Sequence, residues 1–433
     1  MKISSNMSNI IAKEKKFLSS GVTPAYTIAP RIFSYGKGVK LYDIDGNEYY
    51  DFSSGVVTNS TGNCHPRVVE FMKDRIGEVW NIYDYGTPYR IKLFEEFKTI
   101  LPEHIDTFEF YSTGSEAVEA GLRALYSSMK LGKKKICTVV RGFHGKTAGS
   151  RELIEWCLEG ELQKDVYRIH YPDCYRCPLN MEKLTCNDAC LKQAEEILTN
   201  SPDIGALVLE PILGSGGAIK PTYEYFDKIK KICEEKNILI FADEFCLGFG
   251  RTGKDFAFQH FNLEPDLIVF SKGMASGLPF SVIGGRKKIM NKKPFGLPGY
   301  GSSTYGSNPL SIAAAYITIQ VYKDEKLCEN VVKLTPYFKE WLENMKNKYY
   351  RVGSINIAGF YGVLDFVKNR ISKIPDNELG MEVYKQCMEL GVKAMAFNHL
   401  FKIIPPLVIT KEELIDGLNI IDKAIDKAIK VLY

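Results

Sequence analysis

Two residues at the ends of apolar runs have the chemistry to bind an aldehyde. Lys272 follows the run 266–270, and Asp243 follows the run 238–242. A lysine at the end of a buried strand is costly unless its charge is neutralised or its amine is used. A desolvated lysine loses its proton readily and becomes a nucleophile. Pyridoxal 5'-phosphate (PLP) needs such a lysine for its aldehyde and a carboxylate for its pyridinium nitrogen, so the pair predicts a PLP site.

Three turns could hold the rest of such a cofactor. Gly114 and Ser115 stand between an apolar run and the start of a helix, where free amides and a hydroxyl bind phosphate. Ser115 is equally suited to cap that helix. Phe143 follows another apolar run and would either stack on a flat ring or fill the core. The loop 301–309 opens an Ala-rich helix and suits either a phosphate or a helix cap.

The elements that must position these residues alternate along the chain. The helix-like stretches are 67–78, 90–99, 115–130, 190–199 and 222–236, and the apolar runs are 108–111, 136–140, 206–209, 238–242 and 267–270. This alternation predicts an α/β domain over residues 61–325 with a largely parallel sheet.

The two ends of the chain predict a second, smaller unit. Amphipathic helices at 329–348, 379–390 and 411–431 surround strand-like segments at 359–366 and 401–404. This pattern predicts an α+β domain over 326–433. Residues 1 to about 30 look helical and then irregular, and a hairpin follows over 38–51 with its turn at 45–47. We expect the segment 1–60 to pack with the small domain.

Composition excludes several classes of protein. The 433 residues are 45% hydrophobic and 25% charged, which is ordinary for a globular protein. A net charge of +4 is too small to indicate nucleic-acid binding. No apolar stretch reaches the length of a membrane span, and the N-terminus lacks the apolar core of a signal peptide. Eleven cysteines, mostly placed singly, favour a reducing cytoplasm.

The chain resembles the class III (ω-amino-acid type) aminotransferases of PLP fold type I, from about residue 20 to the C-terminus. The matching segments are Gly-Asn-Cys-His-Pro (62–66), Ser-Thr-Gly-Ser-Glu-Ala (112–117), Phe-His-Gly (143–145), Leu-Glu-Pro (209–211), Asp-Glu-Phe-Cys-Leu-Gly-Phe-Gly-Arg-Thr-Gly (243–253), Ser-Lys-Gly (271–273), Ser-Thr-Tyr-Gly-Ser-Asn-Pro (303–309) and Pro-Pro-Leu (405–407). The resemblance implies a large domain with a mostly parallel mixed sheet between helices, and a smaller α+β domain.

The same resemblance implies roles for the matching residues. Lys272 would hold PLP as a Schiff base and move the proton, Asp243 would pair with the pyridinium nitrogen, and Phe143 would lie against the ring. Gly114 and Ser115 would bind the phosphate.

The phosphate would also be bound by Thr304 of a second subunit, because these enzymes are homodimers, or dimers of dimers, with shared active sites. Small-molecule amino donors and carbonyl acceptors would be the partners. Neither nucleic acid nor membrane is implied.

Three positions depart from the commonest family pattern and concern the substrate. Cys246 replaces a glutamine that contacts the cofactor's ring oxygen, a role a thiol fills only weakly. Ser215 stands where glutamate-using members often carry a gating glutamate, and Lys402 stands where many carry a carboxylate-binding arginine. Lys402 either attracts a carboxylate without the fork of arginine or is a plain surface lysine. We therefore expect recognition that differs from the standard glutamate switch.

Four further cysteines form a separate motif. Cys174, Cys177, Cys186 and Cys190 have the Cys-x2-Cys and Cys-x3-Cys spacing of a zinc site or, less readily, of an iron–sulfur cluster. The eight residues between the pairs are few for a zinc ribbon, and similar insertions occur in related aminotransferases without an obligatory metal. We expect free or paired thiols and no metal.

Three functions fit these observations. The first is a transaminase acting on an ω-amino acid, a diamine or another amino-bearing metabolite. The second is an amino-acid racemase or epimerase on the same scaffold, which the run 272–279 resembles. The third is a binding protein without PLP, which the intact pair of Lys272 and Asp243 argues against.

Overall fold

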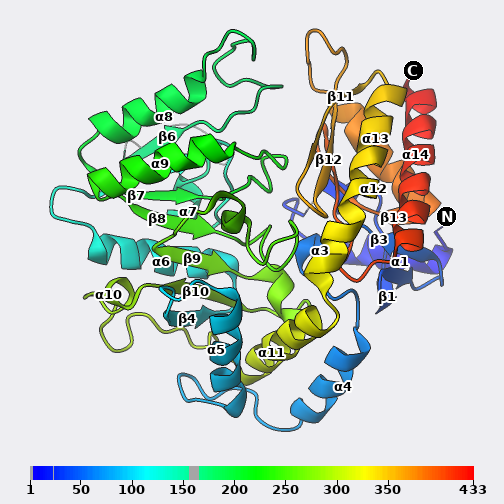
Figure 1. Ribbon diagram of the computed structural model, residues 1–433. Helices are drawn as coiled ribbons and strands as arrows, with labels where there is room; N and C mark the ends of the chain where they lie inside the picture. Colours follow the sequence, from blue (N-terminus) through cyan, green and yellow to red (C-terminus); the bar gives the residue numbers. More distant parts are fainter. Residues whose placement is uncertain (1–2, 23, 156–164) are drawn as a thin grey trace.

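The computed structural model describes residues 3–22, 24–155 and 165–433, whose strands form three sheets (Figure 1). A seven-stranded sheet lies in one half of the molecule, and two four-stranded sheets lie in the other. This arrangement confirms the predicted α/β architecture with a smaller α+β part.

The large sheet is built around central strands that are apolar and largely buried on both faces. In spatial order they are β4 (Thr107–Tyr111), β10 (Ser281–Gly285), β9 (Leu267–Phe270), β8 (Leu239–Asp243), β7 (Ile204–Leu209), β5 (Lys135–Val139) and β6 (Val166–Ile169). Strand β10 is antiparallel to both of its neighbours, and the other pairings are parallel. Strands β10 and β6 were not predicted. Two glycines in β10 and the polar residues of β6 weaken their strand signal.

Helices cover both faces of this sheet, and all but the short α7 and α10 lie close to predicted helical stretches. They are α4 (Pro66–Arg75), α5 (Pro88–Ile100), α6 (Gly114–Ser128), α7 (Ala148–Glu152), α8 (Ala189–Asn200), α9 (Tyr223–Lys236), α10 (Lys287–Met290) and α11 (Pro309–Asp324). Helices α5, α8, α9 and α11 pack on one face of the sheet, whereas α6 and α10 pack on the other.

The smaller unit joins the two ends of the chain. One of its sheets has the order β1 (Phe33–Lys37), β2 (Lys40–Asp43), β3 (Glu48–Asp51), β13 (Val392–Lys393), and the other has the order β11 (Val352–Ile357), β12 (Gly362–Phe366), β15 (Leu400–Ile403), β14 (Met395–Phe397). Its helices are α1 (Ser5–Glu14), α2 (Pro24–Ile28), α3 (Ser54–Val57), α12 (Leu327–Lys348), α13 (Asn377–Leu390) and α14 (Lys411–Leu432).

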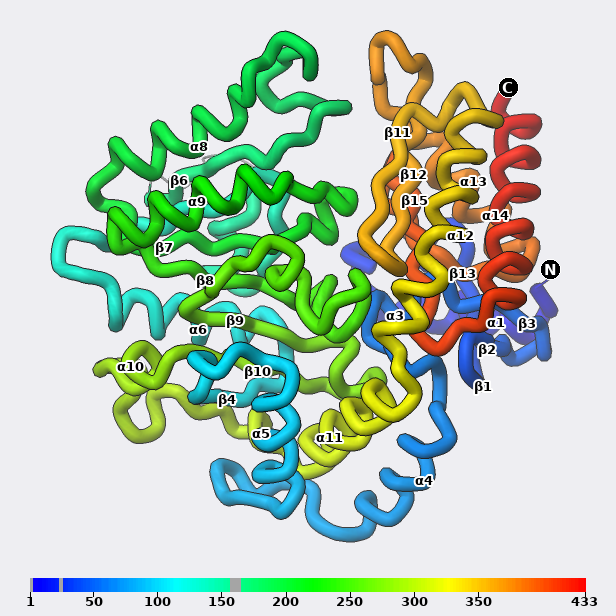
Figure 2. Tube along the Cα trace, viewed as in Figure 1, coloured from blue at the N-terminus to red at the C-terminus, as the bar shows by residue number. Residues whose placement is uncertain are grey.

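One apolar core holds these terminal segments together. Tyr49 and Phe52 of the N-terminal segment are fully buried in the same cluster as Phe338, Phe366 and Ile421. Figure 2 shows the blue N-terminal strands lying beside the orange and red C-terminal elements. Strands β2 and β3 form the hairpin predicted over 38–51. Parts of the predicted N-terminal helical segment, residues 1–2 and 23, lie outside the described residues.

Within the described ranges, no helix is long and apolar enough to cross a membrane.

Candidate active site

The chemistry-bearing residues follow four strands that end at the same edge of the large sheet. Lys272 follows β9, Asp243 ends β8, Glu210 follows β7 and His144 lies in the loop after β5. In α/β sheets ligands bind outside the carboxyl ends of the strands. Lys272 has a positive φ of 47°, which is strained for a side chain of its size and typical of functional positions.

The amine of Lys272 lies against a thiol. Its Nζ donates to the Sγ of Cys246 at 2.8 Å, and burial raises the pKa of that thiol. Burial also disfavours the charged form of Lys272, but Cys246, Asp243 and Glu210 outweigh this effect and leave its pKa raised. The neighbouring acids therefore oppose the effect of desolvation on this amine and favour its charged form.

The carboxylate of Asp243 is fixed in a buried network. Its Oδ2 lies 2.7 Å from Nδ1 of His144, and its Oδ1 accepts from the backbone N–H of Phe245 at 3.1 Å. The second ring nitrogen of His144 lies 3.3 Å from Oγ1 of Thr138. Burial lowers the pKa of His144, but the hydrogen bond and charge of Asp243 have the larger combined effect. The pKa of His144 is therefore raised overall. A protonated His144 stabilises a charged Asp243, as a partner for a pyridinium requires.

Thr113, rather than Ser115, caps helix α6. The Oγ1 of Thr113 accepts from the backbone N–H of Glu116, whose side chain accepts from the N–H of Thr113, so the two form a capping box. The alternative that Ser115 is a helix cap is therefore wrong. Its Oγ instead accepts from the backbone N–H of Lys146 at 3.1 Å.

Two glycines allow close packing beside the N-terminus of α6. A Cβ added at Gly145 would lie 2.6 Å from the Oγ of Ser115, and one added at Gly114 would lie 2.7 Å from the ring of Phe245. Backbone N–H groups at a helix N-terminus bind phosphate. With the amine of Lys272 and the carboxylate of Asp243, this donor set fits PLP.

Glu210 is an active-site residue to which sequence reasoning gave no role. Its Oε1 accepts from the N–H of Phe143, and its Oε2 accepts from the N–H of Gly214, both at 2.9 Å. Burial raises its pKa to about 7. Glu210 thereby ties the loop that carries Phe143 to the loop that carries Ser215. The segment 209–211 belonged to the family pattern, which was the available signal.

Lys402 is buried in strand β15, so the alternative of a plain surface lysine is wrong. Its Nζ donates to the backbone carbonyl of Ser215 at 2.9 Å. Burial lowers its pKa to about 8. Cys246 and Glu210 oppose this effect, whereas the charge of Lys272 adds to it. The structure therefore brings Lys402, Ser215, Cys246 and Lys272 to one site.

The lowered pKa of Lys402 predicts a stability change with pH. Between its folded pKa of about 8 and the ordinary 10.5, the unfolded chain binds more protons than the folded chain, so stability rises with pH in this window. Relative to Lys402→Met, the wild type should gain roughly 2 to 3 kcal/mol as the pH rises from about 7 to about 10. Urea unfolding of both proteins at several pH values measures this difference, and parallel curves would contradict it.

Thr304 is exposed in the loop before α11 and lines a surface cavity together with Glu116 and Thr147. Its predicted role concerns a second subunit and stays a prediction.

The four cysteines of the separate motif line one small cavity before helix α8. No group of three or more His, Cys, Asp or Glu side chains in the described part of the chain is placed to hold a metal ion. Cys174, Cys177, Cys186 and Cys190 are all free thiols.

Comparison with known proteins gives a consistent family. Residues 22–425 match the model of the family described as "Aminotransferase class-III". The chain is 32% identical to a leucine/methionine racemase of Thermococcus litoralis, over 92% of this chain and 91% of that protein. It is 30% identical to an acetylornithine aminotransferase of Caldanaerobacter subterraneus, over 96% and 99%. An ω-transaminase of Pseudomonas jessenii, solved in complex with PMP, superposes with a TM-score of 0.89 at 25% identity and 99% coverage of both chains.

Proposed function

The chain belongs to the class-III aminotransferases, which are PLP-dependent enzymes, and on that premise we propose how its own residues transfer an amino group. The proposed donors are amines or amino acids, and the proposed acceptors are keto acids or aldehydes. The observation that carries the assignment is the placement of Lys272 and Asp243, with its partner His144, at one sheet edge.

When bound, PLP supplies an electron sink for breaking the bond between hydrogen and the amine-bearing carbon. The Nζ of Lys272 would take that proton from the substrate carbon and deliver it to a neighbouring atom. Asp243, held by His144, would keep the ring nitrogen protonated. Phe143 would cover one face of the ring, and Ser115 would bind the phosphate through its hydroxyl.

We propose a homodimer in which Thr304 reaches the partner's phosphate site. Support comes from exposed aromatic side chains in two segments that touch each other, because Tyr83 hydrogen-bonds Ser302 at 2.8 Å. These side chains are Trp80, Tyr83, Tyr85, Tyr300 and Tyr305. Exposed apolar groups gathered in this way mark interaction surfaces. The second apolar core likewise supports the division into domains over 61–325 and 326–433, with residues 1–60 joining the second, because its buried residues other than Tyr322 come from 1–60 and 326–433.

A racemase or epimerase is the second candidate, favoured by the 32% identity to the leucine/methionine racemase. Both reactions begin by removing the same proton, and they differ in where it returns.

One experiment separates the two candidates. The holoenzyme is incubated with single-enantiomer amino acids, with and without a keto acid. We expect the visible absorbance of the cofactor to bleach and to be restored by the keto acid. Inversion of configuration without any acceptor would favour the racemase instead.

A further inference from the structure

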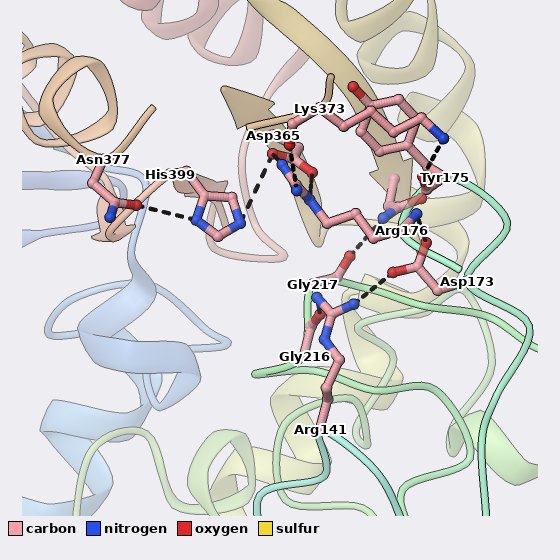
Figure 3. A network of polar contacts seen from close by, with 11 residues as sticks. Arg141, Asp173, Tyr175, Arg176, Gly216, Gly217, Asp365, Lys373, Asn377 and His399 are labelled. Atoms are coloured by element: carbon pink, nitrogen blue, oxygen red, sulfur yellow. Dashed lines mark hydrogen bonds and ion pairs between the residues drawn. The ribbon is translucent and has the colours of Figure 1, made fainter. Parts of the chain in front are cut away.

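Arg141 lies beside the candidate active site and has no role in the reaction proposed above. It follows strand β5 in the loop of Phe143 and has a positive φ of 68°, so its backbone is held in a sparsely populated conformation. Its side chain is 32% exposed. One guanidinium nitrogen, Nη2, donates to the carbonyl of Gly216 at 2.7 Å, and Nη1 pairs with Oδ2 of Asp173 (Figure 3).

The hydrogen bond to Gly216 places Arg141 beside the substrate-binding candidates. Three successive carbonyls each accept from a different side chain: Ser215 from Lys402 at 2.9 Å, Gly216 from Arg141, and Gly217 from Asn356 at 2.9 Å. The charge of Arg141 also contributes to the lowered pKa of Lys402, after burial and the nearer groups. Two cations from different domains thus converge on one short loop of the site.

The guanidinium keeps the capacity for a second partner. The two hydrogen bonds take two of its five N–H groups, and an arginine fork binds a carboxylate through two parallel hydrogen bonds. Asp173 meets Arg141 through Oδ2, while its Oδ1 accepts from the backbone N–H of Arg176 at 3.1 Å. Asp173 can therefore release Arg141 and still hold its own loop.

That loop is anchored independently of Arg141. Arg176 pairs with both carboxylate oxygens of Asp365, at 2.7 and 2.8 Å, and donates to the carbonyl of Lys373 at 2.7 Å (Figure 3). His399 lies 3.9 Å from the same Asp365. The carboxylate of Asp365 is thus already occupied, which leaves Asp173 as the counter-ion of Arg141.

We propose that Arg141 binds the carboxylate of an anionic substrate, with Lys402 beside it, and that Asp173 pairs with Arg141 when the substrate end is uncharged. The inference rests on the proposed transamination and names its substrate class as carboxylate-bearing donors or acceptors. A change of partner between Asp173 and a substrate carboxylate lets one pocket take both charged and uncharged ends without leaving the half-buried guanidinium of Arg141 unpaired.

Binding of succinate, a carboxylate probe that does not react, tests the proposal without turnover. Calorimetry on holoenzyme should show affinity weakened roughly 10- to 100-fold by Arg141→Gln and less by Arg141→Lys, which keeps the charge but loses the fork. Asp173→Asn should strengthen binding several-fold, because its Oδ1 still accepts from Arg176 while the competing charge is gone. Arg286→Gln is the matched control, since Arg286 is similarly buried and paired with Asp266 at 2.9 Å, at the opposite sheet edge.

Two acceptors of equal length then test the role in turnover. Succinic semialdehyde carries a distal carboxylate, and butanal does not. Arg141→Gln should slow the return of the cofactor to its aldehyde form by the first acceptor roughly 10- to 100-fold more than by the second. Equal losses for both acceptors, or unchanged succinate affinity, would overturn the role of Arg141. If wild type binds succinate through Arg141 but neither acceptor reloads it, the proposed transamination fails while the carboxylate site stands.

Discussion

Lys272→Ala is expected to abolish transamination. The amine of Lys272 is the group that would both hold the cofactor and move the proton, and the thiol it contacts cannot replace it. Cys246, at 2.8 Å, has a pKa raised by burial and cannot serve as an equivalent base. Loss of general acid–base catalysis alone costs roughly 100- to 10,000-fold in rate, and loss of the covalent link adds to this. Single-turnover assays with an amino donor measure the effect.

The cofactor itself provides an independent readout for Lys272→Ala. Borohydride treatment should attach the cofactor irreversibly to wild type and leave the variant unlabelled. Lys287→Ala, in the exposed first turn of α10, is the control and should keep both labelling and turnover. Near-normal transamination by Lys272→Ala would remove the residue from the mechanism.

Lys272 and Asp243 could be predicted from the sequence because the residues next to each of them carry the signal. Lys272 and Asp243 each follow an apolar run that becomes a largely buried strand, so their chemistry stands out from the sequence beside them. The longer helices and the strands β5, β7, β8 and β9 were predicted for the same reason, since period and length are local properties.

The supporting residues could not be found in this way, because their roles depend on partners far along the chain. His144 is separated from Asp243 by 99 residues, and Lys402 is separated from Ser215 by 187. Lys402 reads as a surface lysine until strand β15 is placed against the sheet of the small domain. Even the question of whether Ser115 caps its helix turned on which backbone N–H its hydroxyl met.

Asp243→Asn is expected to preserve the fold and to lower turnover roughly 100- to 1,000-fold, the usual cost of removing one preorganised electrostatic partner. Asp243 accepts from His144 on one oxygen and from Phe245 on the other. Asparagine offers a single acceptor oxygen, so its amide group must face one of these partners. A neutral amide also cannot stabilise the positive charge on the ring nitrogen. Steady-state kinetics and the visible spectrum of the bound cofactor measure the loss.

His144 provides the readout that separates lost charge from lost structure. The negative charge of Asp243 raises the pKa of His144, so that pKa should fall in Asp243→Asn and recover in Asp243→Glu, which restores the charge. NMR titration of the imidazole follows this shift while circular dichroism checks the fold. If Asp243→Asn keeps turnover within a few-fold of wild type although the His144 pKa falls, the carboxylate only orders the histidine. The nitrogen of the ring would then need another partner.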